Sequence, residues 1–484
     1  MLLILAPHEA AQEGKSMIET QAPLRPAAAE TLDDLRTAVQ GRVLLPGEPG
    51  FDEAAASWNL MIQHQPRLVV VPADEADVAA AVRYAHRNQL PVAVQTTGHG
   101  QPRRCEGGVL IVMRGLTRIT VDPKTSTARI GGGAVWADVI AQTAPHGLAP
   151  ISGSSPGVGV VGYTIGGGYG LLSRMYGLAV DMVESFRIVT PDGWIRDASP
   201  SHQSDLYWAV LGGGGSFGVV TEMTVRLVPV DCMFGGSVMF DASLADKVYP
   251  AYLAWTKQVP NHVSSAIMMI NFPPVPFVPE FLQGRSMLVV CGTTLGDFDE
   301  AEAWWAPIRS LEGAEFDSFR PMSYAESGDV FRDPTDPLPA TGRGVLIRDL
   351  DEATLGRLLE AIGPAPQSPN LMIQLRHVGG AITSPGRYAN ATGSVREAQY
   401  LLYFLGVPMG PHTPADMAAH AELAFASIES SILKRGPLNW LGEGHVQRDE
   451  IMGVYSEEEY ARLLAVKSLV DPNNRFAFAG VGIE

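Results

Sequence analysis

Three glycine-dense stretches within one half of the chain place the strongest constraint on what this sequence can fold into. They span residues 96–100, 152–170 and 212–218. Any one of them is explained equally well by tight turns, but three in one half of the chain favour a binding role. Glycine allows backbone N–H groups to close around a ligand, and clustered N–H groups form a concavity that suits phosphate. The pattern therefore indicates a cofactor that carries a pyrophosphate.

Two short motifs inside the second stretch suggest other chemistry. Residues 157–162 match G-x-G-x-x-G, the fingerprint of nicotinamide-binding Rossmann folds, which needs a strand before it and a helix that opens on its last glycine. Neither context is evident here, so an NAD(P)-dependent dehydrogenase stays only as an alternative. Residues 153–157 match the serine-hydrolase motif G-x-S-x-G around Ser155. Pro156 has no N–H to offer an oxyanion hole, which excludes the hydrolase.

His99 is the most informative single residue. It lies between Gly98 and Gly100, in the loop that follows a predicted strand over residues 91–95. A lone histidine is more often a simple hydrogen-bonding residue. A ligand held close to this backbone, however, would meet an imidazole nitrogen within bonding distance. No second histidine stands at metal-ligand spacing, so we expect no metal site.

The composition indicates a large, acidic, globular protein. The 484 residues are 46% hydrophobic, and the formal net charge is −17. Such a charge disfavours nucleic acid and anionic membrane surfaces as partners. Three scattered cysteines suit neither a disulfide framework nor a cysteine-ligated zinc site. No apolar run is long enough to span a bilayer, and residues 1–24 lack the basic start of a signal peptide. We expect this segment to be an unstructured lead, with Met17 as an alternative start, on a cytoplasmic protein.

The order of predicted elements favours an α+β fold. Residues 68–95 read as strand, helix and strand, with Asp74 as the helix N-cap. After about residue 230 proline-rich loops separate strands from helices, which suggests a second domain of about 200 residues. Many short strands mixed with helices are typical of α+β proteins.

Taken together, the glycine stretches and the end of the chain resemble the FAD-linked oxidases of the vanillyl-alcohol-oxidase superfamily, which have a PCMH-type FAD-binding domain. Within that superfamily they resemble the berberine-bridge-enzyme-like family. The segments that carry the resemblance are residues 91–100, 155–181, 205–221, 460–467 and 471–476.

The resemblance implies a two-part FAD-binding domain, residues 25–229, to which a C-terminal segment, residues 439–484, returns. A substrate-binding domain with an antiparallel sheet, residues 230–438, is inserted between them. The implied activity is oxidation of a small organic molecule, such as a secondary metabolite, an alcohol, a sugar or an amine. Hydride passes to flavin N5, and O₂ is the expected electron acceptor. A catalytically silent flavin-fold binding protein is the other alternative.

The resemblance also implies which residues bind FAD. They are Thr96, Thr97, Gly98, His99, Gly100, Gln101, Ser154, Ser155, Gly159, Gly162, Tyr163, Gly168, Gly170, Val219, Val220 and Phe476. In this family a histidine at the position of His99 commonly carries FAD through the flavin 8α-methyl group. Ser155 stands where many members have a cysteine bonded to flavin C6, so attachment through His99 alone is implied.

Candidates for the catalytic base come from a predicted strand over residues 395–403, which resembles the strand that brings pocket residues to the flavin in relatives. Glu397 and Tyr403 lie on one face of it, and Glu397 is the ionisable candidate. A solvated edge charge is the competing interpretation of Glu397. Tyr163 and Tyr403 are the alternatives as base. Resemblance of position to the family also implies that Arg376, His377 and Glu443 line the pocket.

Overall fold

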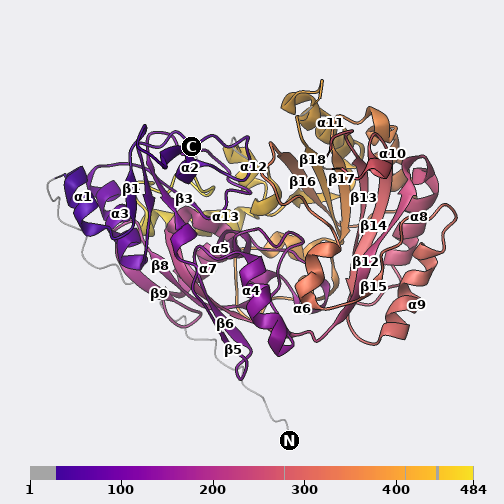
Figure 1. Ribbon diagram of the computed structural model, residues 1–484, viewed down its shortest axis with the longest axis horizontal. Helices are drawn as coiled ribbons and strands as arrows, with labels where there is room; N and C mark the ends of the chain where they lie inside the picture. The colour runs from indigo at the N-terminus through magenta and orange to yellow at the C-terminus, as the bar shows by residue number, and fades with distance from the viewer. Residues whose placement is uncertain (1–28, 277, 409, 443–445, 483–484) are drawn as a thin grey trace, which may run out of the picture.

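The computed structural model describes residues 29–276, 278–408, 410–442 and 446–482. Short and long strands form several sheets, and helices pack on their outer faces (Figure 1). This mixture confirms the α+β class. The predicted lead over residues 1–24, with Met17, lies outside the described residues.

The N-terminal half contains a four-stranded and a five-stranded sheet. In the first, with order β1-β2-β4-β3, β4 pairs in parallel with β2 and β3. The second is antiparallel, with order β5-β6-β10-β8-β9. A separate pair joins β7 to β11. The strands are β1 Arg42–Leu44, β2 Leu68–Val71, β3 Val92–Gln95, β4 Val109–Val112, β5 Ile119–Asp122, β6 Thr127–Gly131, β7 Leu148–Ala149, β8 Val183–Val189, β9 Ile195–Ala198, β10 Val219–Arg226 and β11 Val228–Pro229.

Helices of this half pack around these sheets. They are α1 Leu32–Ala38, α2 Phe51–Ala55, α3 Glu75–Arg87, α4 Trp136–Thr143, α5 Val160–Ile165, α6 Ser173–Tyr176 and α7 Ser204–Gly213. The predicted strand–helix–strand unit is present as β2, α3 and β3. The Asp74 carboxylate accepts a hydrogen bond from the backbone N–H of Asp77 at 3.0 Å, as an N-cap does.

An antiparallel sheet of eight strands forms the other half, with order β15-β12-β14-β13-β17-β18-β16-β19. Its strands are β12 Met233–Asp241, β13 Val263–Asn271, β14 Ser286–Thr294, β15 Arg320–Met322, β16 Thr341–Ile347, β17 Met372–His377, β18 Tyr400–Gly406 and β19 Ile432–Arg435. The helices that pack on its outer face in Figure 1 are α8 Ala245–Thr256, α9 Phe298–Arg309, α10 Glu352–Ile362 and α11 Pro414–Ser427.

The two faces of this sheet contact different parts of the protein. Leu375 of β17 and Phe404 of β18 point into the core beneath the outer helices. Because side chains alternate along a strand, Arg376 and Tyr403 point from the opposite face, toward the N-terminal half. That inner face is the one that can contribute to a site between the two halves.

The end of the chain packs back against the N-terminal half (Figure 1). It contains α12 Arg448–Met452 and α13 Glu457–Val470. The Lys467 ammonium donates to the Ser216 carbonyl at 2.7 Å. The N–H of Val92 donates to the Arg475 carbonyl at 2.7 Å. The predicted domain limits at residues 229 and 439 remain predictions.

No helix within the described ranges is both long and apolar enough to cross a bilayer. Among the same residues, no three His, Cys, Asp or Glu side chains group in a way that could hold a metal ion.

Candidate functional site

A cavity of about 380 Å³ lies between the N-terminal half and the inner face of the eight-stranded sheet. Segments far apart in the sequence meet around it, including all three glycine stretches. Its described lining includes Thr96–Gln101, Gly153–Ser155, Val158, Gly159, Val161–Tyr163, Ile165, Gly166, Tyr169, Gly214, Gly215, Gly218, Val220, Arg376, Tyr403, Leu438–Trp440, Gly442, Phe476 and Phe478. The size falls in the range of small-molecule sites, about 300–1,000 Å³.

Two glycines of the first stretch lie at the cavity wall, and a side chain would have a different effect at each. Gly98 has φ +77°, and a Cβ on it would lie 2.7 Å from the Cβ of Ser57. A Cβ on Gly100 would meet no heavy atom within 4 Å. Since Gly100 lines the cavity, a side chain there would occupy cavity space. The first glycine allows the turn, and the second keeps the cavity open.

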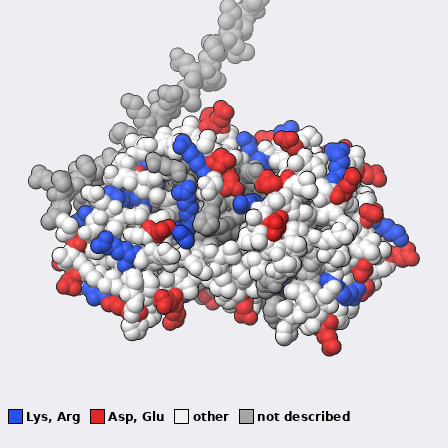
Figure 2. Space-filling view, turned by 90° about the horizontal axis from the view of Figure 1, so that it is seen from above, with Lys and Arg blue, Asp and Glu red and all other residues white. Residues whose placement is uncertain are grey.

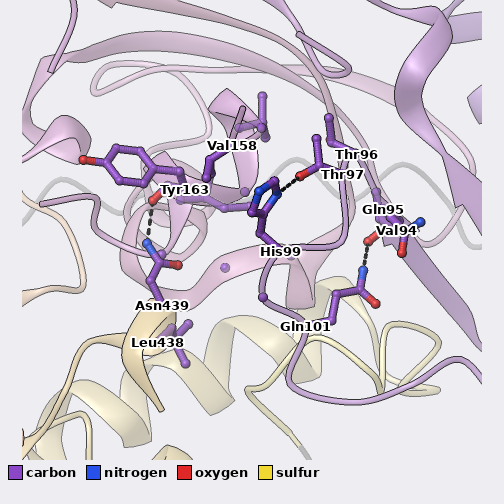
Figure 3. A pocket seen from close by; sticks show the side chains of 18 of the residues that line it. Val94, Gln95, Thr96, Thr97, His99, Gln101, Val158, Tyr163, Leu438 and Asn439 are labelled. Carbon is purple, nitrogen blue, oxygen red and sulfur yellow. Dashed lines mark hydrogen bonds between the residues drawn. The ribbon is translucent and has the colours of Figure 1, made fainter. Parts of the chain in front are cut away.

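The His99 ring lines the cavity and is held from two sides, by Thr97, as Figure 3 shows, and by Trp58. Its Nδ1 lies 2.7 Å from the Thr97 hydroxyl oxygen. Its plane stacks on Trp58, with ring centroids 4.3 Å apart and 13° between the planes. Burial lowers the pKa of His99 from 6.5 to about 4. The imidazole is therefore neutral at neutral pH and retains one nitrogen lone pair.

Tyr163 is the main side chain of the second glycine stretch. Its carbonyl accepts a hydrogen bond from the Asn439 amide at 2.8 Å (Figure 3). Its hydroxyl is buried and has no hydrogen-bond partner among the described residues. Burial raises the pKa of the phenol well above 10.0. At neutral pH the phenol is thus protonated, which equips Tyr163 to donate a hydrogen bond and makes it a poor base.

Not every glycine predicted to bind cofactor lines the cavity. A Cβ on Gly168 would lie 2.6 Å from the Tyr163 ring, and one on Gly170 would lie 1.8 Å from the Ser152 carbonyl oxygen. These two glycines make room for the surroundings of Tyr163 and stand behind the cavity wall. Ser154, Ser155, Gly159 and Gly162 do line it.

The third stretch and the end of the chain complete this wall. Gly214, Gly215 and Gly218 line the cavity, and so does Val220 at the start of β10. Val219 is buried instead in the core around α3, since neighbouring strand residues point to opposite faces. Phe476 packs in the same core and also reaches the cavity.

The eight-stranded sheet supplies the other wall. Arg376 and Tyr403 line the cavity from β17 and β18, and Trp440 follows the last strand. The Tyr403 and Trp440 rings meet edge to face, with centroids 4.9 Å apart. His377 is not among the lining residues, as its Nε2 lies 2.9 Å from a nitrogen of Arg174. Glu443 lies outside the described residues.

Glu397 is not at the cavity. The strand predicted from Val395 begins only at Tyr400, because residues Gly393–Glu397 turn in a 3₁₀ helix that buries Val395. The Glu397 carboxylate is 68% exposed and lies 3.6 Å from Arg348. The strand prediction is wrong here, and the competing interpretation of a solvated charge describes Glu397. Tyr403, on the real strand, does reach the cavity.

Sequence reasoning missed some residues of the site. Trp58 was not predicted, although it stacks on His99, because it belongs to a loop with no motif of its own. Tyr169 also lines the cavity. It stands between Gly168 and Gly170, so the glycine stretch itself was a signal that could have drawn attention to it.

This fold and its glycine-lined cavity define a flavin-dependent oxidoreductase. Residues 66–199 match the family model described as an FAD binding domain. The Rossmann alternative is not favoured. The G-x-G-x-x-G motif follows a loop, and the short helix α5 begins inside it.

Relatives place the chain more narrowly. It is 30% identical over 455 residues to (R)-6-hydroxynicotine oxidase of Paenarthrobacter nicotinovorans, an alignment that covers 91% of this chain and 96% of the relative. The chain therefore belongs to the PCMH-type family of FAD-linked oxidases, as the sequence motifs indicated, and is an FAD-dependent oxidoreductase.

Solved structures of this family have a similar fold. The structure of 6-hydroxy-D-nicotine oxidase from Arthrobacter nicotinovorans matches with a TM-score of 0.78 at 26% identity, covering 94% of this chain and all of the other. A berberine-bridge-enzyme-like protein from Physcomitrella patens has a TM-score of 0.79 at 20% identity and covers 94% of this chain and 100% of its own. The second match supports the fold alone.

Proposed function

We propose that the protein oxidises a small organic molecule with FAD held in this cavity, attached through His99 and reoxidised by O₂. The observation that carries the proposal is the position of His99, which lies inside a cavity that all three glycine stretches line. The relatives' names, which refer to oxidases of small molecules, support the reaction class.

The residues present suit FAD. Gly100 and Gly162 line the cavity, and a Cβ on either would meet nothing within 4 Å. The buried Gln101 side-chain oxygen and Tyr163 hydroxyl both lack a partner among the described residues. Residues in reach of the cofactor are Thr96–Gln101, Ser154, Ser155, Gly159, Gly162, Tyr163, Val220 and Phe476. Gly168, Gly170 and Val219 support them from behind.

His99 is prepared for covalent attachment. A neutral imidazole is the nucleophilic form, and burial keeps the ring neutral. Thr97 and Trp58 fix the plane of the ring before any bond forms. Attachment would replace one imidazole N–H bond and one flavin C–H bond with a C–N bond, which releases two electrons and two protons. O₂ would accept both and become H₂O₂. Ser155 lines the cavity but offers no thiol for a second bond.

The bound flavin supplies an acceptor for hydride, and the protein has to position the substrate and manage its proton. No Asp or Glu is among the described residues that line the cavity. A carboxylate base is therefore not part of the proposal. Tyr403, next to Trp440 on the sheet wall, is the residue that we propose to handle the proton. Tyr163 keeps its own proton and donates a hydrogen bond.

The test is acid precipitation of the purified protein. We expect a yellow pellet from the wild type and a colourless pellet from His99→Ala. His262→Ala is the matched control, because this histidine is only partly buried and is not among the cavity's lining residues. It should leave the pellet yellow. A colourless wild-type pellet beneath a yellow supernatant would contradict covalent attachment. Absence of colour from both, after addition of FAD, would contradict the proposed site.

A protein that holds FAD without catalysis would also give a yellow pellet. Anaerobic addition of candidate substrates separates the two, since bleaching of the flavin absorbance marks hydride transfer. Return of the colour on admission of air would support O₂ as acceptor. Secondary metabolites as the substrate class, and the cytoplasm as the compartment, belong to the same proposal.

A further inference from the structure

Arg376 is a buried cation at the cavity, and the described residues provide no anion that pairs with it. Its side chain is on β17, and the residue is 6% exposed. Its Nε–H donates to the Gln374 side-chain oxygen at 2.5 Å, and one terminal nitrogen donates to the Ser154 hydroxyl at 3.2 Å. Among the described residues, no ion pair within 4.0 Å includes Arg376. Of its five N–H groups, two therefore have protein acceptors and the rest remain available.

Other sheltered arginines in the protein do have matched partners. Arg174, which is 3% exposed and is not among the cavity's lining residues, donates to the carbonyl oxygens of Val263 and Val378. Arg396 pairs with the Asp181 carboxylate at 2.7 Å. Burying a guanidinium costs free energy unless anions or several acceptors compensate it. Arg174 also lacks an ion pair among the described residues, but three acceptors surround it, whereas Arg376 has two and faces the cavity. The difference indicates that a ligand in the cavity supplies the remaining acceptors of Arg376.

The charge around the cavity points the same way. The chain carries 52 Asp and Glu residues against 35 Lys and Arg. On the face shown in Figure 2, acidic and basic side chains are interspersed over a largely uncharged surface. None of those carboxylates lines the cavity within the described part of the chain, where Arg376 is the one Lys or Arg. The interior of the cavity therefore favours an anion, in a protein whose net charge is negative.

Aromatic rings hold the guanidinium in place. Its central carbon lies 4.7 Å from the ring centroid of Phe331, 4.9 Å from that of Trp440 and 5.8 Å from that of Tyr169. Cation–π contacts of this kind leave the planar edge of the guanidinium free for a bidentate bond to a carboxylate. Trp440 and Tyr169 also line the cavity, so a ligand bound to Arg376 meets flat apolar surfaces beside it.

We propose that the substrate is an organic acid, with a carboxylate held by Arg376 and a planar, apolar or aromatic body against Trp440 and Tyr169. Arg376 is thus a specificity-determining residue. This inference rests on the proposed function, because the bound acid is a substrate only if the protein oxidises small molecules. FAD phosphates are the other anion near the cavity. We assign those phosphates to the side of the cavity formed by the three glycine stretches, whose backbone N–H groups suit phosphate. Arg376 lies on the opposite side, on the eight-stranded sheet.

The experiment compares benzoate with its neutral analogue benzamide, by calorimetry on the FAD-loaded protein. In the wild type we expect benzoate to bind at least about tenfold more tightly than benzamide. Arg376→Gln should weaken benzoate about twentyfold and leave benzamide nearly unchanged. Arg376→Lys, which keeps the charge without the planar fork, should fall between them. Arg348→Gln, an exposed arginine away from the cavity, is the matched control and should bind both ligands as the wild type does.

Three outcomes would overturn the inference. Equal wild-type affinities would show that the cavity does not select an anion. Unchanged benzoate binding in Arg376→Gln would show that another group holds it. Loss of FAD from Arg376→Gln would assign the guanidinium to the cofactor. None of these measurements needs turnover, so they stand apart from the proposed oxidase reaction. That reaction fails separately, if the wild type holds no flavin.

Discussion

The two walls of the cavity are built from different material. The N-terminal wall presents glycine backbone from all three stretches, among side chains that include His99 and Tyr163. The wall from the eight-stranded sheet consists of large side chains, Arg376, Tyr403 and Trp440. Backbone N–H groups suit a constant ligand such as a pyrophosphate, whereas side chains can be exchanged without changing the sheet. Under the proposed function we therefore expect the first wall to bind the cofactor and the second wall to select the substrate.

The largest effect is expected from adding a single methyl group to the glycine wall. Gly98→Ala puts a Cβ within 2.7 Å of Ser57, at a φ of +77°. Strain and overlap together should lower the free energy of unfolding by about 3 kcal/mol and remove most of the bound flavin. Denaturant titration and the ratio of flavin to protein absorbance measure the two effects.

Gly107→Ala separates the overlap from the strain. This glycine also has a positive φ, +66°, but a Cβ on it would meet nothing within 4 Å. It should cost about 1 kcal/mol and keep the flavin. Equal losses for the two variants would mean that close backbone approach is not what the first wall requires, and the contrast between the walls would weaken.

The two walls differ in how far the sequence predicts them, because one uses residues that are neighbours in the chain and the other depends on strand pairing. Gly98, His99 and Gly100 are neighbours in the chain, so a local motif contains their arrangement. Arg376 reaches the cavity because β17 pairs with β18 and exposes its inner face, a long-range fact that no local pattern contains. Its place in the pocket was suggested by resemblance of position. That no described carboxylate pairs with it emerged only from the fold.

The error at Glu397 has a physical cause of the same kind. The strand was expected from Val395 because the segment resembles a strand of relatives. The structure instead turns there, with the N–H of Ala398 donating to the Val395 carbonyl at 3.2 Å. The turn buries Val395 and Ala398 under the sheet edge. Resemblance over such a short segment does not show where the turn ends and β18 begins.

A smaller effect is expected from pH, which acts on the His99 imidazole and so on the rate of covalent FAD attachment. Burial lowers the pKa of His99 to about 4, so the neutral ring persists as the pH falls until about that value. In flavin-free protein mixed with FAD, the rate of covalent attachment should change less than twofold between pH 8 and pH 5.5. At pH 5.5 a pKa of 4 leaves about 97% of the ring neutral, whereas the ordinary value leaves about a tenth.

The yield of protein-bound flavin after acid precipitation, followed over time, gives this rate. A midpoint near pH 6.5 would show that the ring is solvated like a free histidine. The glycine wall would then fail to shield it, and the nucleophile would need another explanation. The wild type at pH 8 provides the reference rate.

The smallest effect on the rate of flavin reduction is expected from substitution of Glu397. This prediction tests whether the sheet side of the cavity extends as far as residue 397. Its carboxylate is 68% exposed and 3.6 Å from the Arg348 guanidinium. An exposed pair of this kind contributes about 0.5 kcal/mol or less. Glu397→Gln should therefore leave the rate of flavin reduction within twofold of the wild type. A base in contact with substrate would instead lower that rate at least about tenfold when removed.

Tyr403→Phe is the informative comparison, because Tyr403 is six residues further along the chain and does line the cavity. Stopped-flow reduction under anaerobic conditions, with the same substrate for both variants, measures the two rates. A slower Tyr403 variant beside an unchanged Glu397 variant would assign the chemistry to the inner face of β18. A tenfold lower rate of flavin reduction in Glu397→Gln would mean that the 3₁₀ turn before β18 reaches the substrate. That turn would then belong to the sheet side of the cavity.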